Sequence, residues 1–160
     1  MTTFGRHRDL QLDFPPTAVP IVIVGANEAG KSTLFEFVVT MLFGFEPADR
    51  SSHPYRPWVD GGVLGGSLDL ELGDGEVSVV TRELADRPRG ERRYASGHRL
   101  TFVNEPIVEL QGVSRPLYRD LGALADDDLR RLDFSSWRRI EDRLLSGAAG
   151  ALRPASEVIR

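Results

Sequence analysis

The sequence predicts an α/β protein with a mixed central sheet, an antiparallel β subdomain and a helical C-terminal region. Three observations support this fold class. An apolar run at residues 21–24 is followed by a glycine-containing loop and by an apolar run at residues 31–43, which is the order of a buried strand, a loop and a buried helix. Apolar and polar side chains alternate at residues 67–72 and 76–82, as in strands with one buried face. Helical periodicity dominates from residue 113 onward.

The composition is that of a soluble globular protein. The chain has 160 residues, 41% of them hydrophobic and 28% charged, which is enough for one domain with a core. Its net charge of −4 gives no overall positive field that would attract nucleic acid. No apolar run approaches the roughly 20 residues that cross a bilayer, the N-terminus has no signal-peptide pattern, and cysteine is absent. We therefore expect a cytoplasmic protein that does not contact membranes.

The loop between the two apolar runs has the pattern G-x-x-x-x-G-K-[ST], from Gly25 to Ser32. Between a strand and a helix this pattern predicts a phosphate-binding loop. Its glycines should adopt positive φ and leave room for phosphate, so that loop N–H groups surround an anion. Lys31 would place its ammonium on the β- and γ-phosphates, while Ser32 would ligate Mg²⁺. The residues predicted to bind nucleotide here are Gly25, Ala26, Asn27, Glu28, Ala29, Gly30, Lys31, Ser32 and Thr33.

The alternative is a plain glycine turn between a buried strand and a buried helix. It would not explain why Lys and Ser fall together after the second glycine. The basic residues make the same point, because 19 of the 20 are Arg and the remaining one is Lys31.

The loop interior, GANEAGKST, resembles the N-E-A-G-K-S-T variant of SMC/RecF-like ABC-type ATPases, a group that includes SbcC-like and YhaN-like AAA proteins. The N-terminal pattern F-x-x-x-x-x-L-x-L-x-F and the LFGF at residues 42–45 agree with this resemblance. The resemblance implies a P-loop NTPase of ABC/SMC type that binds ATP and Mg²⁺. It also implies a C-terminal ATPase lobe as partner, a homodimer around ATP, and a role in DNA repair or chromosome maintenance, with DNA as a candidate partner.

Under this resemblance residues 1–160 are the N-terminal lobe. Residues 1–45 would hold two strands, the phosphate loop and its helix, residues 46–112 a loop and antiparallel strands, and residues 113–160 a helical, Q-loop-like region. A strand is expected over residues 2–14.

The resemblance adds candidate residues outside the loop. A basic residue shortly after the first Phe approaches the nucleotide in this family, which makes Arg6 a candidate, with a solvated strand position as the alternative. Residues 45–66 form a long loop rich in Pro and Gly, and such loops are unusual unless functional. Its side chains could approach the nucleotide or the partner lobe, or could be an aromatic anchor for a surface loop: His53, Tyr55, Arg56 and Trp58.

A metal ligand is also implied. The apolar pattern after residue 117 places Asp126 near the position of the family's Q-loop Gln, which contacts Mg²⁺ and the attacking water. Three alternatives remain. Asp126 or Asp127 could bind the metal, or the metal site could be degraded. The three acids at residues 126–128 could also be only favourable charges at a helix N-terminus.

The β subdomain is expected to hold a hairpin at residues 67–82 and a second strand pair at residues 100–103 and 107–110. Residues 82–99 between them contain six Arg. We expect a solvated, mobile hairpin tip there, with a nucleic-acid phosphate contact as the alternative.

Several parts of a complete ATPase have no counterpart in the sequence. No apolar run ends in Asp-Glu, as a Walker B strand would, and Leu145-Ser146-Gly147 matches the L-S-G-G signature only until Ala148. We therefore expect a half-site that binds ATP and scarcely hydrolyses it alone. A stand-alone P-loop nucleotide switch and an inactive interaction fragment remain alternatives. The absence of N/T-K-x-D favours ATP over GTP.

Overall fold

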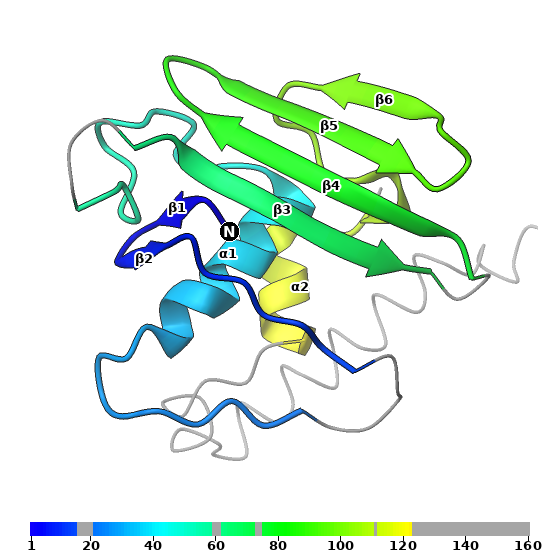
Figure 1. Cartoon of the computed structure of the whole chain (residues 1–160). Helices are drawn as coiled ribbons and strands as arrows, with labels where there is room; N and C mark the ends of the chain where they lie inside the picture. The colour runs from blue at the N-terminus through cyan, green and yellow to red at the C-terminus, as the bar shows by residue number, and fades with distance from the viewer. Residues whose placement is uncertain (16–20, 59–61, 73–74, 111, 123–160) are drawn as a thin grey trace, which may run out of the picture. The chain divides into compact units, whose positions relative to one another are not determined.

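The computed structural model describes residues 1–15, 21–58, 62–72, 75–110 and 112–122. The chain divides into two units, Met1–Gln111 and Gly112–Arg160. The first unit holds an antiparallel sheet with strand order β2-β1-β3-β4-β5-β6 (Figure 1). The strands are β1 (Thr3–Phe4), β2 (His7–Arg8), β3 (Leu64–Glu71), β4 (Val77–Leu84), β5 (Pro88–Tyr94) and β6 (Arg99–Phe102).

The strands from β3 to β6 form a meander, because each pairs antiparallel with the next one along the chain. The N-terminal hairpin of β1 and β2 joins this meander at the edge formed by β3, where Thr3 pairs with Gly65. The expected antiparallel β subdomain is thus present in the described residues. The predicted mixed sheet is not, because all strand pairs among these residues are antiparallel.

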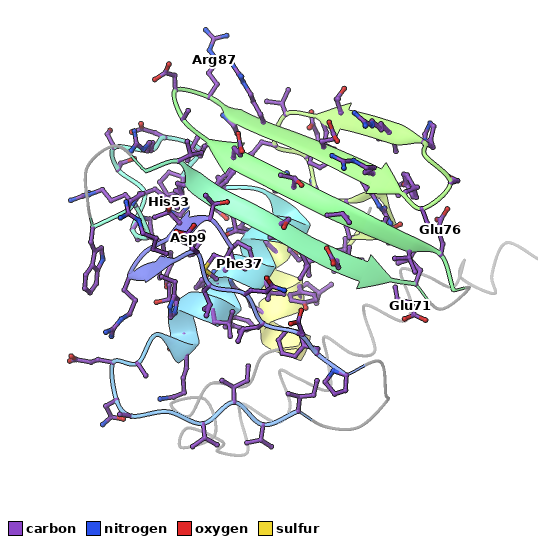
Figure 2. All side chains as sticks on the ribbon, in the orientation of Figure 1. Asp9, Phe37, His53, Glu71, Glu76 and Arg87 are labelled. Carbon is purple, nitrogen blue, oxygen red and sulfur yellow. The ribbon has the colours of Figure 1, made fainter. Side chains whose placement is uncertain are left out.

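Helix α1 (Lys31–Phe43) packs against β3 and β4 of this sheet (Figure 1). Phe37, labelled in Figure 2, and Met41 of the helix share a buried cluster with Phe4 of β1. The rings of Phe4 and Phe37 meet edge to face with centroids 5.5 Å apart, a favoured arrangement for aromatic pairs. The remaining buried members of the cluster are Phe45, Leu64 and Leu84.

The C-terminal end of α1 is held by polar groups from distant parts of the chain. Arg82 of β4 donates from Nε to the carbonyl oxygen of Met41 at 2.8 Å, and the N–H of Ile107 donates to the carbonyl oxygen of Leu42 at 3.0 Å. A guanidinium at the negative end of a helix is favourable. Asn104 completes the arrangement, because its side chain exchanges two hydrogen bonds with the backbone of Phe45, of 2.7 and 3.0 Å.

The expectation of a mobile basic tip at residues 82–99 is wrong, because these residues form part of β4, all of β5 and the start of β6. Arg82 is fully buried and Arg92 is 2% exposed. Arg92 donates to Ser78 Oγ at 3.0 Å and to Glu109 Oε2 at 2.7 Å. By contrast, Arg87 projects from the β4–β5 turn into solvent (Figure 2). The inward face of the sheet therefore uses two of these arginines as structural hydrogen-bond donors.

One expected strand, over residues 2–14, is instead the short hairpin of β1 and β2, and two others, at residues 21–24 and 107–110, are absent from the described residues. β2 ends at Arg8, and Asp9 turns the chain with a φ of 48° while its N–H bonds to the carbonyl of Thr2. Residues 107–110 contain a short 3-10 helix, η1 (Val108–Leu110), because the N–H of Leu110 bonds to the carbonyl oxygen of Ile107 at 3.0 Å. Residues 21–24 form no strand, and all four side chains are exposed. A central strand requires neighbours on both edges, and no described strand pairs with this segment.

The second unit begins with helix α2 (Arg115–Gly122). Ser114 precedes it and accepts a hydrogen bond at Oγ from the N–H of Leu117 at 3.2 Å, as an N-cap does. This agrees with the expected onset of helix after residue 113. The rest of the expected helical region lies outside the described residues. No described helix has the length and apolar character that a membrane crossing requires.

Candidate functional site

The glycine-containing loop leads directly into α1, whose N-cap is Gly30 with a φ of 95°. Glu28 also adopts a positive φ, of 63°, and the N–H of Ala29 closes a turn on the carbonyl of Ala26 at 3.2 Å. Alternation of right- and left-handed residues turns successive N–H groups toward one side, which makes an anion-binding concavity. The expectation of positive φ is confirmed at Gly30 and wrong at Gly25, where a Cβ would instead press on that of Ala29 at 3.2 Å.

Lys31 folds back over this loop. Its ammonium donates to the carbonyl oxygens of Gly25 and Ala26, both at 2.8 Å, and the side chain is exposed. An ammonium has three N–H donors, so these two bonds leave a third for another acceptor. The Lys31 ammonium is thus held against the loop in an exposed position, where an anion from solvent could contact it.

The first turn of α1 has no side-chain cap. Its first N–H to carbonyl bond runs from Leu34 to Gly30 at 2.9 Å, so the N–H groups before Leu34 lie at the helix start, where the helix itself supplies no acceptor. Ser32 is exposed and Thr33 half-buried at this end. Uncapped N–H groups, the helix dipole and a nearby ammonium together fit a phosphate, and the free hydroxyl of Ser32 is a hard oxygen ligand that fits Mg²⁺.

The β1–β2 hairpin covers the loop from the other side. His7 donates from Nε2 to the carbonyl oxygen of Gly30 at 3.1 Å, and a Cβ added to Gly30 would lie 2.3 Å from the same nitrogen. At the hairpin turn, a Cβ on Gly5 would lie 2.9 Å from Cγ2 of Thr33. Sequence reasoning placed His7 on the first strand and gave it no role, because no local pattern links it to a glycine 23 residues away.

Arg6 lies beside the loop, as the family resemblance led us to expect. Its Cδ would be 3.0 Å from a Cβ on Gly30, and its side chain is exposed. Its guanidinium carbon lies 5.8 Å from the ring centroid of Trp58, within the range of a cation–π contact. The structure therefore brings Arg6 close to both Gly30 and Trp58, while a direct role of Arg6 in nucleotide binding stays a prediction.

The segment before Trp58 is pinned by aromatic packing, which confirms the anchor interpretation for part of this loop. His53, labelled in Figure 2, is 2% exposed and meets the rings of Phe4 and Phe45 edge to face. Tyr55 stacks on Phe4 with centroids 5.1 Å apart. Arg56 bonds to a neighbouring backbone carbonyl at 3.0 Å. Nearby, hydrogen bonds from the hydroxyls of Ser51 and Ser52 lower the pKa of Asp49.

The proposed metal ligand Asp126 lies outside the described residues. Among the residues that are described, no three His, Cys, Asp or Glu side chains are grouped so that they could hold a metal ion. Of the two predicted metal ligands, Ser32 is the one that lies within the described residues.

Comparison with known proteins gives two matches. A family model described as "AAA domain" matches residues 1–132. "Uncharacterized protein YhaN" of Bacillus subtilis (strain 168) is 41% identical over 79 residues, which cover 49% of this chain and 8% of that protein. The chain thus spans a small part of this relative's length. No solved structure matches. Both matches agree with the resemblance to SMC/RecF-like and YhaN-like proteins, and because the family model covers most of the chain, the chain belongs to the AAA domain family, which has a P-loop NTPase fold.

Proposed function

We propose that this domain binds ATP together with Mg²⁺ on the loop from Gly25 to Ser32, as the N-terminal lobe of an ABC-type ATPase of the SMC/RecF class. The observation that carries the proposal is the position of Lys31. Its ammonium rests on two loop carbonyls at the uncapped start of α1, next to two residues with positive φ. This combination concentrates N–H donors and a positive charge in one place, and no ion pair with Lys31 occurs among the described residues, although Glu28 belongs to the same loop.

Each loop residue has a distinct part in this proposal. Backbone N–H groups of residues 27, 28 and 30–33 bind phosphate oxygens, while that of Ala29 closes the turn on Ala26. Lys31 exchanges its loop carbonyls for the β- and γ-phosphates. The Ser32 hydroxyl holds Mg²⁺, which supplies charge neutralisation at the phosphate oxygens when bound. His7 of the hairpin holds the Gly30 peptide by a hydrogen bond to its carbonyl oxygen and leaves no space for a side chain at residue 30.

The proposal of a missing partner lobe rests on residues 21–24. Ile21, Val22, Ile23 and Val24 are 46%, 79%, 48% and 86% exposed. An apolar, β-branched segment with both faces exposed directly before the phosphate loop has the composition of a buried strand but lacks, among the described residues, the neighbouring strands it would need. We infer that strands of a C-terminal lobe, from further sequence or another chain, pair with it, and that the complete protein dimerises around ATP and hydrolyses it in DNA repair or chromosome maintenance.

The test compares the purified chain with Lys31→Ala by calorimetric titration with ATP·Mg²⁺. We expect Lys31→Ala to lose at least about tenfold in affinity, because a charge-assisted bond to phosphate disappears. The thermal melting temperature should stay unchanged, because the Lys31 side chain is exposed. Arg93→Ala is the matched control, since it removes an exposed positive charge on β5. Equal affinities for all three proteins would reject the site, and no binding by the parent chain would favour the interaction fragment.

A further inference from the structure

The edge of β3 that faces away from β4 is open along most of its length. The N–H of Leu72, which directly follows β3, donates to the carbonyl oxygen of Glu76 at 2.9 Å on the β4 side. Every second residue of an antiparallel strand bonds to the same neighbour, so the backbone groups of three residues face the other edge: Ser67, Asp69 and Glu71. Gly65 fits this alternation, because its carbonyl oxygen accepts a hydrogen bond from the N–H of Thr2 at 3.1 Å on that edge. Among the described strands, β1 pairs with β3 at Gly65 and at no residue beyond it.

A cavity of about 510 Å³ lies along this open edge, between β3 and residues 9–14. Figure 1 shows the dark-blue segment that follows β2 passing beneath β3. The sheet order β2-β1-β3 places β1 between the same two parts of the chain, and Met1, just before β1, lines the cavity. The cavity thus continues the position of β1, and at this end its walls stand two strand spacings apart, roughly 10 Å. We call it the β3 slot, because its shape suits one more extended strand.

The two sides of the β3 slot differ in polarity. Its floor is lined by apolar side chains of α1 and β3: Leu34, Phe37, Val38 and Leu68. On the opposite wall, Leu12 and Phe14 are 44% and 48% exposed. The rim carries three exposed carboxylates, none of which forms an ion pair with a described residue: Asp9, Asp13 and Asp69. A strand in the slot would turn alternate side chains toward the apolar floor and the acidic rim, which Phe37 and Asp9 represent in Figure 2.

We propose that the β3 slot binds an extended strand of a partner chain in which apolar and basic residues alternate. The backbone of this strand pairs with residues 67–71. Its apolar side chains cover the floor formed by α1, and its basic side chains meet the carboxylates of the rim. Strand addition of this kind gains affinity from main-chain hydrogen bonds and specificity from alternate side chains. It does not depend on nucleotide binding, because no residue that lines the slot belongs to the loop at residues 25–32.

Charge and topology favour a partner strand over the two other occupants. A second copy would bring its own acidic β3 edge, and like charges on paired strands are destabilising. Residues 10–14 would have to cross a full strand spacing to reach β3, because they continue from β2 and β1 lies between β2 and β3. The amino group of Met1 also holds them in place by donating to the carbonyl oxygen of Leu10 at 3.0 Å. A partner strand with basic residues meets neither obstacle.

The experiment titrates the full chain by calorimetry with a short peptide of alternating Val and Arg, acetylated and amidated at its ends. We expect this peptide to bind at least about tenfold more tightly than one with the same residues grouped as all Val and then all Arg. Asp69→Arg should weaken binding of the alternating peptide at least about tenfold, because it reverses a charge at the slot. Asp86→Arg is the matched control, since it makes the same charge change at an exposed position of the β4–β5 turn and should bind as the parent does. Equal affinity for the two peptides, or equal affinity of the parent and Asp69→Arg, would overturn the proposal.

Amide hydrogen exchange followed by NMR tests the strand pairing itself. Bound peptide should slow exchange at Ser67, Asp69 and Glu71 and change it little at Leu68 and Leu70, whose N–H groups already face β4. If the first three amides exchange slowly without peptide at every protein concentration, residues 10–14 close the slot. If they do so only at high protein concentration, a second copy fills it, and either result rejects the partner strand. No binding of the alternating peptide by the parent would also reject it and would mean that the carboxylates only guard an exposed edge.

Discussion

His7 and Gly30 are in direct contact, with Nε2 of the imidazole 3.1 Å from the glycine carbonyl oxygen. The contact joins the N-terminal hairpin to the first residue of the α1 cap, and it leaves no room for a side chain at Gly30. The predicted phosphate-binding loop is thus shaped from two directions, by its own positive φ angles and by a histidine from another segment of the chain.

We expect Gly30→Ala to abolish ATP binding and to lower the free energy of unfolding by more than the positive φ alone explains. A non-glycine residue in the left-handed region costs about 1–2 kcal/mol, and here the added Cβ also lies 2.3 Å from His7 Nε2. Urea denaturation measures the unfolding free energy and calorimetry the binding.

Gly97→Ala separates the two causes. Gly97 has a φ of 87° with nothing within 4 Å of an added Cβ, so this variant carries the backbone strain without the clash. A double variant, Gly30→Ala with His7→Ala, should regain part of the lost stability. If Gly30→Ala and Gly97→Ala lower the free energy of unfolding equally, the close approach of His7 to Gly30 does not restrict the residue at this position.

Lys31 gives a second prediction, because it is the sole lysine of the chain. Its exposed ammonium should react with an amine-directed reagent readily without ligand and more slowly with ATP·Mg²⁺, since the phosphates then cover it. The amino group of Met1, which donates to the carbonyl of Leu10 at 3.0 Å, is the internal control in the same molecule. Mass spectrometry of the two modified peptides gives both rates. The same degree of protection at both amines would place ATP elsewhere.

A third prediction concerns Arg82, whose burial the sequence did not reveal. We expect Arg82→Met to lower the free energy of unfolding by about 2–4 kcal/mol, because the carbonyls of Met41 and Glu105 both lose a charged donor. Arg93→Met is the matched control on the exposed face, with an expected change within about 0.5 kcal/mol. Urea unfolding of both variants checks it. Similar values for the two would restore the solvated interpretation of this arginine-rich segment.

The comparison of Arg82 and Arg93 shows where sequence reasoning ends. Strand alternation predicts that Arg82 shares a face with Val80 and Leu84, yet an arginine in such a pattern is ordinarily assigned to solvent. Its acceptors are carbonyls at the end of α1 and before η1, more than 20 residues away along the chain. No local pattern encodes those partners, so burial of the charge could not be predicted.

The phosphate-binding loop was predictable for the opposite reason. Its geometry depends on glycine, a lysine and a helix start that are adjacent in sequence. The structure has Gly30 with a positive φ at the start of α1 and the Lys31 ammonium over the loop, while nucleotide binding by these residues stays a prediction. Residues 21–24 show the limit again. Their apolar pattern predicted a buried strand, but all four side chains are exposed and no described strand pairs with the segment.

The last prediction is that this chain binds ATP and scarcely hydrolyses it alone. Hydrolysis requires a positioned water and charge stabilisation beyond the loop, and one arginine supplied by a partner is worth about 10³ to 10⁵ in rate. The loop and Ser32 supply binding and one metal ligand, whereas no Walker B pair and no complete signature motif occur in the sequence. We expect steady-state phosphate release near background from the purified chain, with Lys31→Ala as the control for contaminating ATPases, and a large gain when a C-terminal lobe is added in trans or by fusion. Turnover on the order of 1 s⁻¹ that disappears in Lys31→Ala would instead identify a stand-alone enzyme, because the loop would then be sufficient for chemistry that we assign to two lobes.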